Sequence, residues 1–231
     1  MLTLDNLILR QNDFTLRANI SLAHGSSTAI IGPSGAGKST LLSAIAGFLA
    51  PSAGRISWQG QDITTCAPGK RPLSILFQDQ NLFPHLTIAQ NLGLGLSPRL
   101  RLSDKDRDTI AQALADTGLT AYAQRKPPQL SGGQQSRAAL ARTLLRNKPI
   151  LLLDEAFAAL GPALKSEMLD LTGKLTTDAK LTTVMVTHDP DDAAAFCPNT
   201  IAVTDGVAHP PCPTQSLLAS PPPALRAYLG A

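Results

Sequence analysis

The segment Gly32-Pro-Ser-Gly-Ala-Gly-Lys-Ser39 combines closely spaced glycines with one lysine and one hydroxyl side chain. Glycines let backbone N–H groups converge on an anion, and a helix that begins at the same point adds partial positive charge. Lys38 can then reach the β- and γ-phosphates of a nucleotide, and the Ser39 hydroxyl can ligate Mg²⁺. The pattern is GxxxxGK[ST], and the alternative is an ordinary glycine-rich turn. The residues expected to hold ATP here are Gly32, Pro33, Ser34, Gly35, Ala36, Gly37, Lys38, Ser39 and Thr40.

A second candidate for chemistry is the acidic pair Asp154-Glu155, which directly follows the apolar run Ile150–Leu153. An uninterrupted apolar strand is typical of a parallel sheet buried on both faces, and such sheets bind ligands at their carboxyl ends. Asp154 is therefore expected to hold Mg²⁺, and Glu155 to act as the general base that orients the attacking water. Taken alone, two adjacent acids could equally be a surface cap.

Elements that could position these residues are predicted from periodicity. Residues 2–9 and 14–22 alternate as two antiparallel strands, and strand Ser26–Ile31 leads into a helix from about Lys38, with Leu41, Leu42, Ile45 and Phe48 facing inward. Later strands are expected at 55–59, 72–77, 150–154, 181–187 and 200–204, and helices at 87–96, 104–118, 134–147, 162–177 and 190–196. The later elements alternate as βαβ units, which implies a mostly parallel sheet.

The segment Leu130-Ser-Gly-Gly-Gln134 precedes the helix expected at 134–147. Ser131 and Gln134 have the spacing of a capping box, which begins helices in many proteins. The two intervening glycines are unusual for a cap alone, because they remove side chains and let N–H groups approach an anion. Another phosphate group is the natural anion.

With this segment between a phosphate loop and an LLLDE strand, the chain resembles the ABC ATPase family. The resemblance implies an α/β P-loop ATPase core with a mostly parallel sheet, N-terminal antiparallel strands and an inserted helical subdomain. It implies one domain over residues 1–231, with core 1–83 and 135–210, helical subdomain about 84–134, and tail 211–231. It also implies a head-to-tail homodimer, in which the signature residues Ser131, Gly132, Gly133 and Gln134 contact the ATP held by the partner.

Further residues match the family by position. Gln78 stands where the family has a glutamine that touches Mg²⁺ and water, and His188 matches its switch histidine, although a lone histidine after a strand is more often a surface residue. Both are expected to be catalytic beside Glu155, and Gln78 to be a metal ligand beside Ser39 and Asp154. Residues 81–86 correspond to the groove that receives the membrane subunit.

Three positions depart from the family pattern. Gly161 replaces the aspartate of the loop that communicates across the dimer, and Ala156 replaces a proline. No aromatic residue stands near Gln11, where one would stack on adenine, which leaves Phe14 either as a substitute or as a core residue of its strand.

The resemblance covers nearly the whole chain and is strongest to the ATPase subunits of bacterial thiamine and thiamine pyrophosphate importers, on segments 77–88, 93–96 and 162–168. It implies membrane permease subunits, a periplasmic solute-binding protein and a place at the cytoplasmic face of the inner membrane. ATPases for other solutes (polyamine, iron, sulfate), for lipoprotein release, or soluble ABC proteins of DNA repair or translation are the alternatives.

Composition limits the other classes of function. The net charge is +3 and no long basic block is present, so nucleic acid is not an expected partner. Three scattered cysteines, Cys66, Cys197 and Cys212, indicate neither a disulfide framework nor a zinc site. The sequence shows no signal peptide at its start and no apolar run of about 18 residues, so any role at a membrane requires a partner.

Overall fold

A computed structural model describes residues 1–79 and 81–229, which form two compact units. Unit 1 consists of Met1–Leu73, Pro149–Glu155 and the described part of Thr176–Ala231. Unit 2 consists of Ser74–Lys148 and Ala156–Leu175. The chain therefore leaves unit 1 twice, once after Leu73 and once after Glu155.

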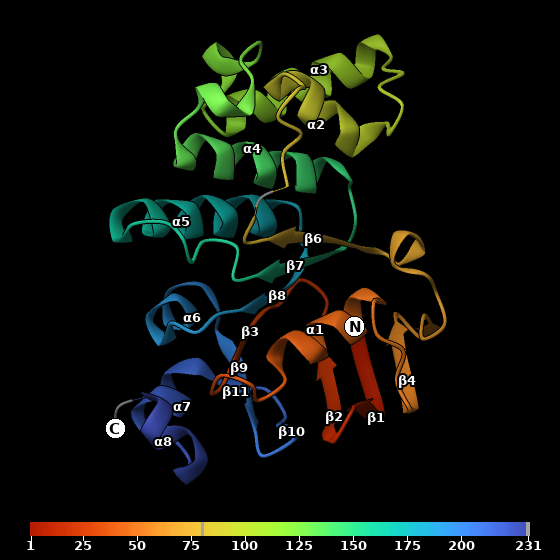
Figure 1. The fold of residues 1–231 in the computed structure, drawn as a ribbon, viewed down its shortest axis with the longest axis vertical. Coiled ribbons are helices and arrows are strands. Elements are labelled where there is room, and N and C mark those ends of the chain that lie inside the picture. Colours follow the sequence, from red (N-terminus) through yellow and green to blue (C-terminus); the bar gives the residue numbers. More distant parts are fainter. Residues whose placement is uncertain (80, 230–231) are drawn as a thin grey trace. The chain divides into compact units, whose positions relative to one another are not determined.

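Unit 1 is built on a twisted mixed sheet (Figure 1). Its strands are β1 (Leu2–Gln11), β2 (Phe14–Leu22), β3 (Ser27–Ile31), β4 (Ala53–Trp58), β5 (Gln61–Asp62), β7 (Ile150–Asp154), β8 (Thr182–Val186), β9 (Asn199–Thr204), β10 (Val207–Ala208) and β11 (Cys212–Pro213). They follow the order β5-β4-β1-β2-β10-β9-β3-β8-β7, and β11 pairs with β9. The pairs β3–β8, β3–β9 and β7–β8 are parallel, whereas β1–β2 and β1–β4 are antiparallel, so the predicted fold class is confirmed.

The sequence pattern explains the two kinds of strand. In β2 the buried residues alternate with exposed ones, as expected for a strand with one face toward a core. In β7 the four apolar residues Ile150–Leu153 are all at most 1% exposed, because the strand is covered on both faces. The carboxyl end of β7 thus presents Asp154 at the rim of the sheet.

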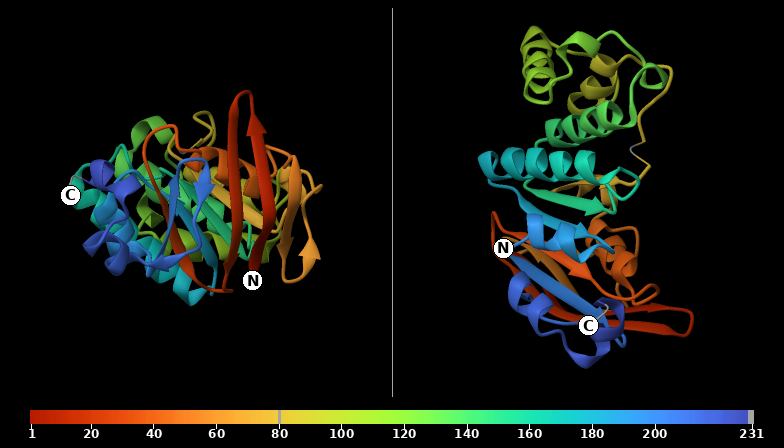
Figure 2. Two further views of the ribbon diagram at one scale, coloured as in Figure 1. Left: turned by 90° about the horizontal axis from the view of Figure 1, so that it is seen from below. Right: turned by 90° about the vertical axis from the view of Figure 1, so that its left-hand side faces the viewer.

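The helices of unit 1 are α1 (Lys38–Ala46), α6 (Pro190–Phe196), α7 (Thr214–Ala219) and α8 (Pro223–Leu229), with a 3₁₀ turn η1 (Pro68–Lys70). After Pro210 the described part of the chain forms α7 and α8, which both pack beside β9 (Figure 2). Thr214 at the start of α7 is buried and donates to the carbonyl oxygen of Cys197 at 2.6 Å.

The prediction that Phe48 faces inward from α1 is wrong. Leu41, Leu42 and Ile45 are buried as expected, but Phe48 is 59% exposed. The helix ends at Ala46, and Gly47 follows it in the left-handed conformation, so the helical period no longer applies at Phe48. The buried Arg71 closes this end of α1 by donating to the carbonyl oxygens of Ala44 and Ile45, each at 2.7 Å.

Unit 2 contains most of the helices. Its elements are β6 (Leu73–Phe77, which begins at the last residue of unit 1), α2 (Ile88–Leu96), α3 (Asp104–Asp116), η2 (Thr120–Tyr122), η3 (Pro127–Gln129), α4 (Gly132–Leu145) and most of α5 (Pro162–Asp178). Capping boxes begin α2, α3 and α4, which explains where these helices start. The helical core consists of Ile88, Leu92, Ile110, Leu114, Leu119, Leu130, Ala138 and Ala141.

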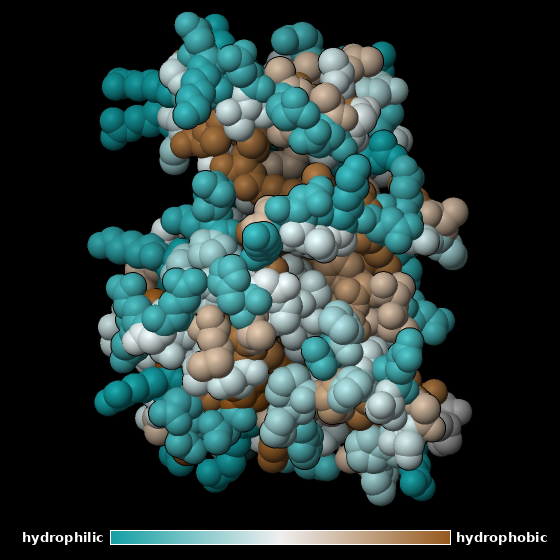
Figure 3. Space-filling model, turned by 180° about the vertical axis from the view of Figure 1, so that it is seen from behind, coloured by the Kyte–Doolittle hydropathy of each residue, from teal (hydrophilic) through white to brown (hydrophobic). Residues whose placement is uncertain are grey.

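The outer side of α3 is charged, since Asp104, Lys105, Arg107 and Asp108 are all exposed. Figure 3 shows mainly hydrophilic residues over this part of unit 2. Within residues 1–79 and 81–229, no helix is long and apolar enough to cross a membrane.

Candidate functional site

The loop between β3 and α1 has the geometry predicted for a phosphate loop. Strand β3 ends at Ile31 and α1 begins at Lys38, so Gly32–Gly37 form the turn that joins them. Gly37 has a φ of 104°, and a methyl group there would lie 2.7 Å from the ring of Phe14. Only glycine satisfies both the left-handed backbone and this close approach. The N-terminus of α1 therefore opens toward the loop.

Lys38 folds back over this loop. Its Nζ donates to the carbonyl oxygens of Gly32 at 2.7 Å and Pro33 at 3.0 Å, and the residue is only 9% exposed. Burial lowers the pKa of Lys38 below its ordinary value, while the negative charge of Glu155 acts in the opposite direction. The ammonium group is thus held at the loop by neutral carbonyl oxygens that a phosphate can replace.

A pocket of about 420 Å³ opens on this loop. It is lined by Gln11, Phe14, Ser34, Gly35, Gly37, Lys38, Ser39, Thr40 and Glu155. Phe14 is the first residue of β2 and is half-buried, so it belongs to its strand and also lines the pocket. Gln11 joins the site through a hydrogen bond of 3.1 Å between its side-chain oxygen and the Thr40 hydroxyl.

The acidic pair lies at the end of β7, as predicted. Burial raises the pKa of Asp154, and the neighbouring charge of Glu155 raises it further. Glu155 has a φ of 48°, which is uncommon for a residue with a side chain. Its N–H donates to the carbonyl oxygen of Val186 on β8 at 3.1 Å. Such backbone outliers are found preferentially at functional sites.

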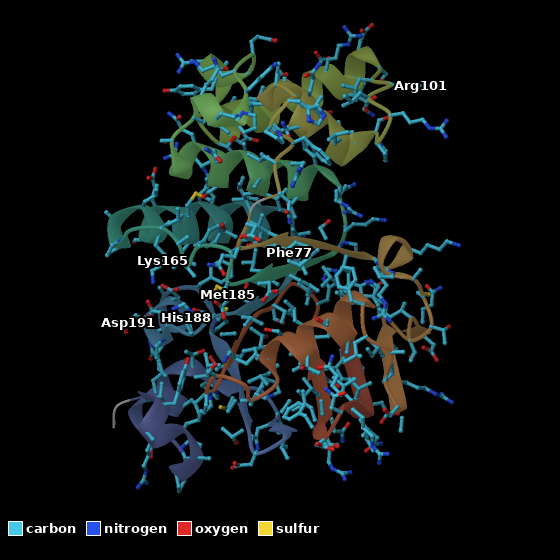
Figure 4. The ribbon with its side chains drawn as sticks, viewed as in Figure 1. Phe77, Arg101, Lys165, Met185, His188 and Asp191 are labelled. Atoms are coloured by element: carbon cyan, nitrogen blue, oxygen red, sulfur yellow. The ribbon has the colours of Figure 1, made fainter. Side chains whose placement is uncertain are left out.

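His188 lies close to Glu155. Its Nδ1 is 3.5 Å from Glu155 Oε2, and its side chain is 60% exposed, so it faces open space beside the acid. Figure 4 shows Met185, His188 and Asp191 in order along the segment that leads from β8 into α6. Asp189, which stands just before Pro190, caps α6 by accepting from the N–H of Asp191 at 3.0 Å. Unit 1 therefore contains the phosphate loop, the acidic pair and the histidine together.

The signature segment Ser131–Gln134 lies at the start of α4 in unit 2. The Ser131 hydroxyl accepts from the Gln134 N–H at 3.4 Å, and Gln134 Oε1 accepts from the Ser131 N–H at 3.0 Å. The capping box considered for these residues therefore exists. The two glycines differ, because a methyl group at Gly133 would lie 2.6 Å from the Leu164 side chain, whereas Gly132 has no neighbouring atom within 4 Å of that position.

Gln78 is exposed just after β6 in unit 2. Of the following loop, Gln80 lies outside the described residues. Asn81 accepts a hydrogen bond from Arg142 of α4 at its carbonyl oxygen, at 2.7 Å. Asn91, which is fully buried, accepts from the Phe83 N–H at 2.8 Å and donates to the carbonyl oxygens of Phe83, Leu86 and Thr87 at 3.0–3.3 Å.

The departures at 156 and 161 also belong to unit 2. Ala156 is buried, and Gly161 is exposed with open space where a side chain would begin. A Cβ atom at position 161 would therefore meet no steric obstacle.

Sequence reasoning missed two residues of these sites, Asn91 and Tyr228. Asn91 is a polar residue at an otherwise apolar position of α2, which could have marked it. Tyr228, whose hydroxyl donates to the His188 carbonyl oxygen at 2.7 Å, comes from a tail without any motif.

Comparison with known proteins agrees with this geometry. The family model described as ABC transporter matches residues 16–158. The chain is 62% identical to the thiamine import ATP-binding protein ThiQ of Cereibacter sphaeroides, over 100% of both chains. It is 55% identical to the protein of the same name from Ruegeria sp., again over 100% of both chains.

A solved structure is similar as well. The chain resembles cbiO1 from Clostridium perfringens, described as part of the ABC transporter complex cbiONQ, with a TM-score of 0.83 and 29% identity. The match covers 95% of this chain and 90% of that one. Together with the phosphate loop, the acidic pair and the signature turn, these matches show that the chain belongs to the ABC transporter family, as one of its ATP-hydrolysing subunits.

Proposed function

We propose that this chain is the ATPase subunit of an importer for thiamine or thiamine pyrophosphate. The observation that carries the substrate assignment is the full-length similarity to relatives named as thiamine import ATP-binding proteins. The nucleotide pocket supports the ATPase part, but it contains nothing that would recognise the transported solute.

ATP enters the pocket with its phosphates at the Gly32–Ser39 loop. Lys38 exchanges its two carbonyl partners for oxygens of the β- and γ-phosphates, and the N–H groups at the start of α1 bind the same anion. The ring of Phe14 lines the pocket and can offer an apolar surface to the adenine base. Residues Gly32 to Thr40 thus form the binding half contributed by this chain.

The acidic residues and Ser39 fit a magnesium ion by their chemistry. Mg²⁺ prefers oxygen ligands, and the exposed Ser39 hydroxyl, the Asp154 carboxylate and the Gln78 side-chain oxygen are of that kind. The raised pKa of Asp154 also reflects a carboxylate whose negative charge is poorly compensated in the free chain. When bound, Mg²⁺ neutralises charge on the β- and γ-phosphates.

Glu155 accepts a proton from the attacking water as general base. His188, 3.5 Å from this carboxylate, is placed to contact the γ-phosphate and to keep the water aligned. Gln78 is the third residue that we propose to be catalytic. The uncommon backbone of Glu155 fits such a role, because conformations of this kind cluster at active sites.

The signature turn completes the site of a second copy. Gly132 presents bare backbone, while Ser131 and Gln134 fix the start of α4 and Gly133 packs on Leu164. In a head-to-tail homodimer, Ser131–Gln134 would contact the γ-phosphate held by the partner copy. ATP then holds the dimer closed, and hydrolysis reopens it.

Coupling to transport would pass through residues 79–86, which receive the membrane permease subunits at the cytoplasmic face of the inner membrane. The buried Asn91 holds the main chain of Phe83, Leu86 and Thr87 through its carboxamide, which would keep the part of this segment from Phe83 onward in one shape. A periplasmic solute-binding protein delivers the substrate and does not contact this chain.

Uptake in the source bacterium tests the proposal. Deleting the gene for this chain should abolish uptake of labelled thiamine and leave polyamine and sulfate uptake unchanged. Wild-type chain should restore uptake, whereas the Glu155→Gln variant should not. Loss of polyamine or sulfate uptake with normal thiamine uptake would contradict the substrate assignment.

A further inference from the structure

The C-terminal helix α8 brings a tyrosine to the nucleotide site of unit 1. Leu225 is 0% exposed and anchors this helix, which packs beside β9 (Figure 2). One turn further on, the Tyr228 hydroxyl donates to the main-chain carbonyl oxygen of His188 at 2.7 Å. The two residues are 40 positions apart, so only the folded tail makes this contact.

The surroundings of the same hydroxyl oppose its ionisation. Burial and then the charge of Asp189 raise the pKa of Tyr228, the Gly32 backbone acts against this rise, and the charge of Glu155 adds to it. The phenol therefore stays protonated and remains a hydrogen-bond donor to the His188 carbonyl.

The rest of the loop around His188 is fixed by local bonds. The N–H of Thr187 donates to the Ile30 carbonyl at 3.3 Å, and the N–H of Asp189 donates to the Thr187 hydroxyl at 3.0 Å. The imidazole itself is 60% exposed and is held at 3.5 Å from Glu155. The peptide group between His188 and Asp189 is thus held on both sides. Its N–H donates to the Thr187 hydroxyl, and its carbonyl oxygen accepts from Tyr228.

We propose that Tyr228 is a positioning residue for hydrolysis, which aligns His188 with Glu155 through its hydrogen bond to the His188 carbonyl oxygen. The proposal rests on the role proposed above for His188. It gives the C-terminal tail a function in the catalytic cycle and makes α8 part of the nucleotide site.

The Tyr228→Phe variant tests this directly, because it removes the hydroxyl and keeps the ring. Loss of one such hydrogen bond should lower kcat for ATP about fivefold, with KM for ATP within about twofold of wild type. The full chain contains four histidines, so the imidazole resonance of His188 can be followed by NMR beside those of His24, His85 and His209. Only the His188 resonance should move.

Two further variants separate positioning from general stability. Tyr122→Phe alters the chain's other tyrosine, in unit 2, and should change neither kcat nor the His188 resonance. Leu225→Ala keeps the hydroxyl but loosens α8, and should lower kcat and move the same resonance. A Tyr228→Phe variant with wild-type kcat, or with lowered kcat and an unmoved His188 resonance, would overturn the proposal. If His188→Ala itself keeps wild-type turnover, the role of His188 fails, while the resonance shift still reports whether Tyr228 positions it.

Discussion

The phosphate loop in unit 1 and the signature turn in unit 2 both place glycines at the N-terminus of a helix, but they complete those helix ends differently. Among the described residues no side chain caps α1, whose preceding residue is the left-handed Gly37. Helix α4 instead has a complete capping box between Ser131 and Gln134. The start of α1 therefore stays open for a ligand, whereas at the start of α4 the Gln134 N–H is already bound by the Ser131 side chain.

This difference indicates that the two helix ends have different functions. The open end, with the folded-back Lys38 and a pocket of about 420 Å³, is built to collect and hold a nucleotide. The capped end has its first turn fixed by the two Ser131–Gln134 hydrogen bonds and offers bare backbone at Gly132, which suits a surface that touches a phosphate held elsewhere.

The largest effect is expected at Glu155. The Glu155→Gln variant removes the general base and should lower ATP turnover by ~10²–10⁴-fold, because that is the usual contribution of a positioned base. Nucleotide binding should persist, since the phosphate loop is unchanged. Steady-state ATPase rates and equilibrium binding of ATP measure the two effects. Wild-type turnover in the variant would remove Glu155 from the mechanism.

A smaller effect, on binding, is expected at Lys38. Lys38→Ala deletes the cation that faces the phosphates, and should weaken binding of a non-hydrolysable ATP analogue about 10- to 100-fold, as for loss of charged hydrogen bonds. Isothermal titration measures the affinity, and thermal unfolding serves as the control for folding. An unchanged affinity would contradict the role given to this lysine.

Alanine substitution of the two signature glycines should change the free energy of unfolding by different amounts. Gly133→Ala forces a methyl group against Leu164 and should lower the free energy of unfolding by about 1–3 kcal/mol. Gly132→Ala has open space and should be neutral or stabilising by no more than ~1 kcal/mol, yet it should slow hydrolysis by crowding the partner's phosphate. Urea unfolding and ATPase assays test the pair. Equal unfolding midpoints would contradict this assignment of the glycines.

The smallest effect is expected at Gly161. Gly161→Asp restores the family's carboxylate in open space, and should raise basal hydrolysis and the coupling between the two sites a few-fold, with ATP affinity unchanged. The ATPase rate and its Hill coefficient, measured with the membrane partner, are the readouts. A lower rate in the variant would mean that the loop has adapted to glycine.

The sequence predicted best the features that are local. The phosphate loop, the β7 strand with its acids and the capped helices depend on residues a few positions apart, and the structure has them where expected. Phe48 was misplaced because the helical period predicts burial only while the helix continues, and α1 ends at Ala46.

The features that the sequence did not predict are non-local. The φ of Glu155 depends on the Val186 carbonyl across the sheet, and Tyr228 meets His188 only after the tail has packed on β9. Neither contact leaves a pattern in the residues around it. Long-range packing therefore contributed the parts of the site that spacing could not show.

The central claim is that each ATP is held by the phosphate loop of one copy and the signature turn of another. Analytical ultracentrifugation of the Glu155→Gln chain with ATP and Mg²⁺ tests it most directly, beside a Glu155→Gln/Gly132→Glu double variant. The added side chain would begin in open space at Gly132, and its charge would face the partner's phosphate. We predict an ATP-dependent dimer for the single variant, and a monomer that still binds ATP for the double variant. A double variant that dimerises as well as the single one would contradict the claim.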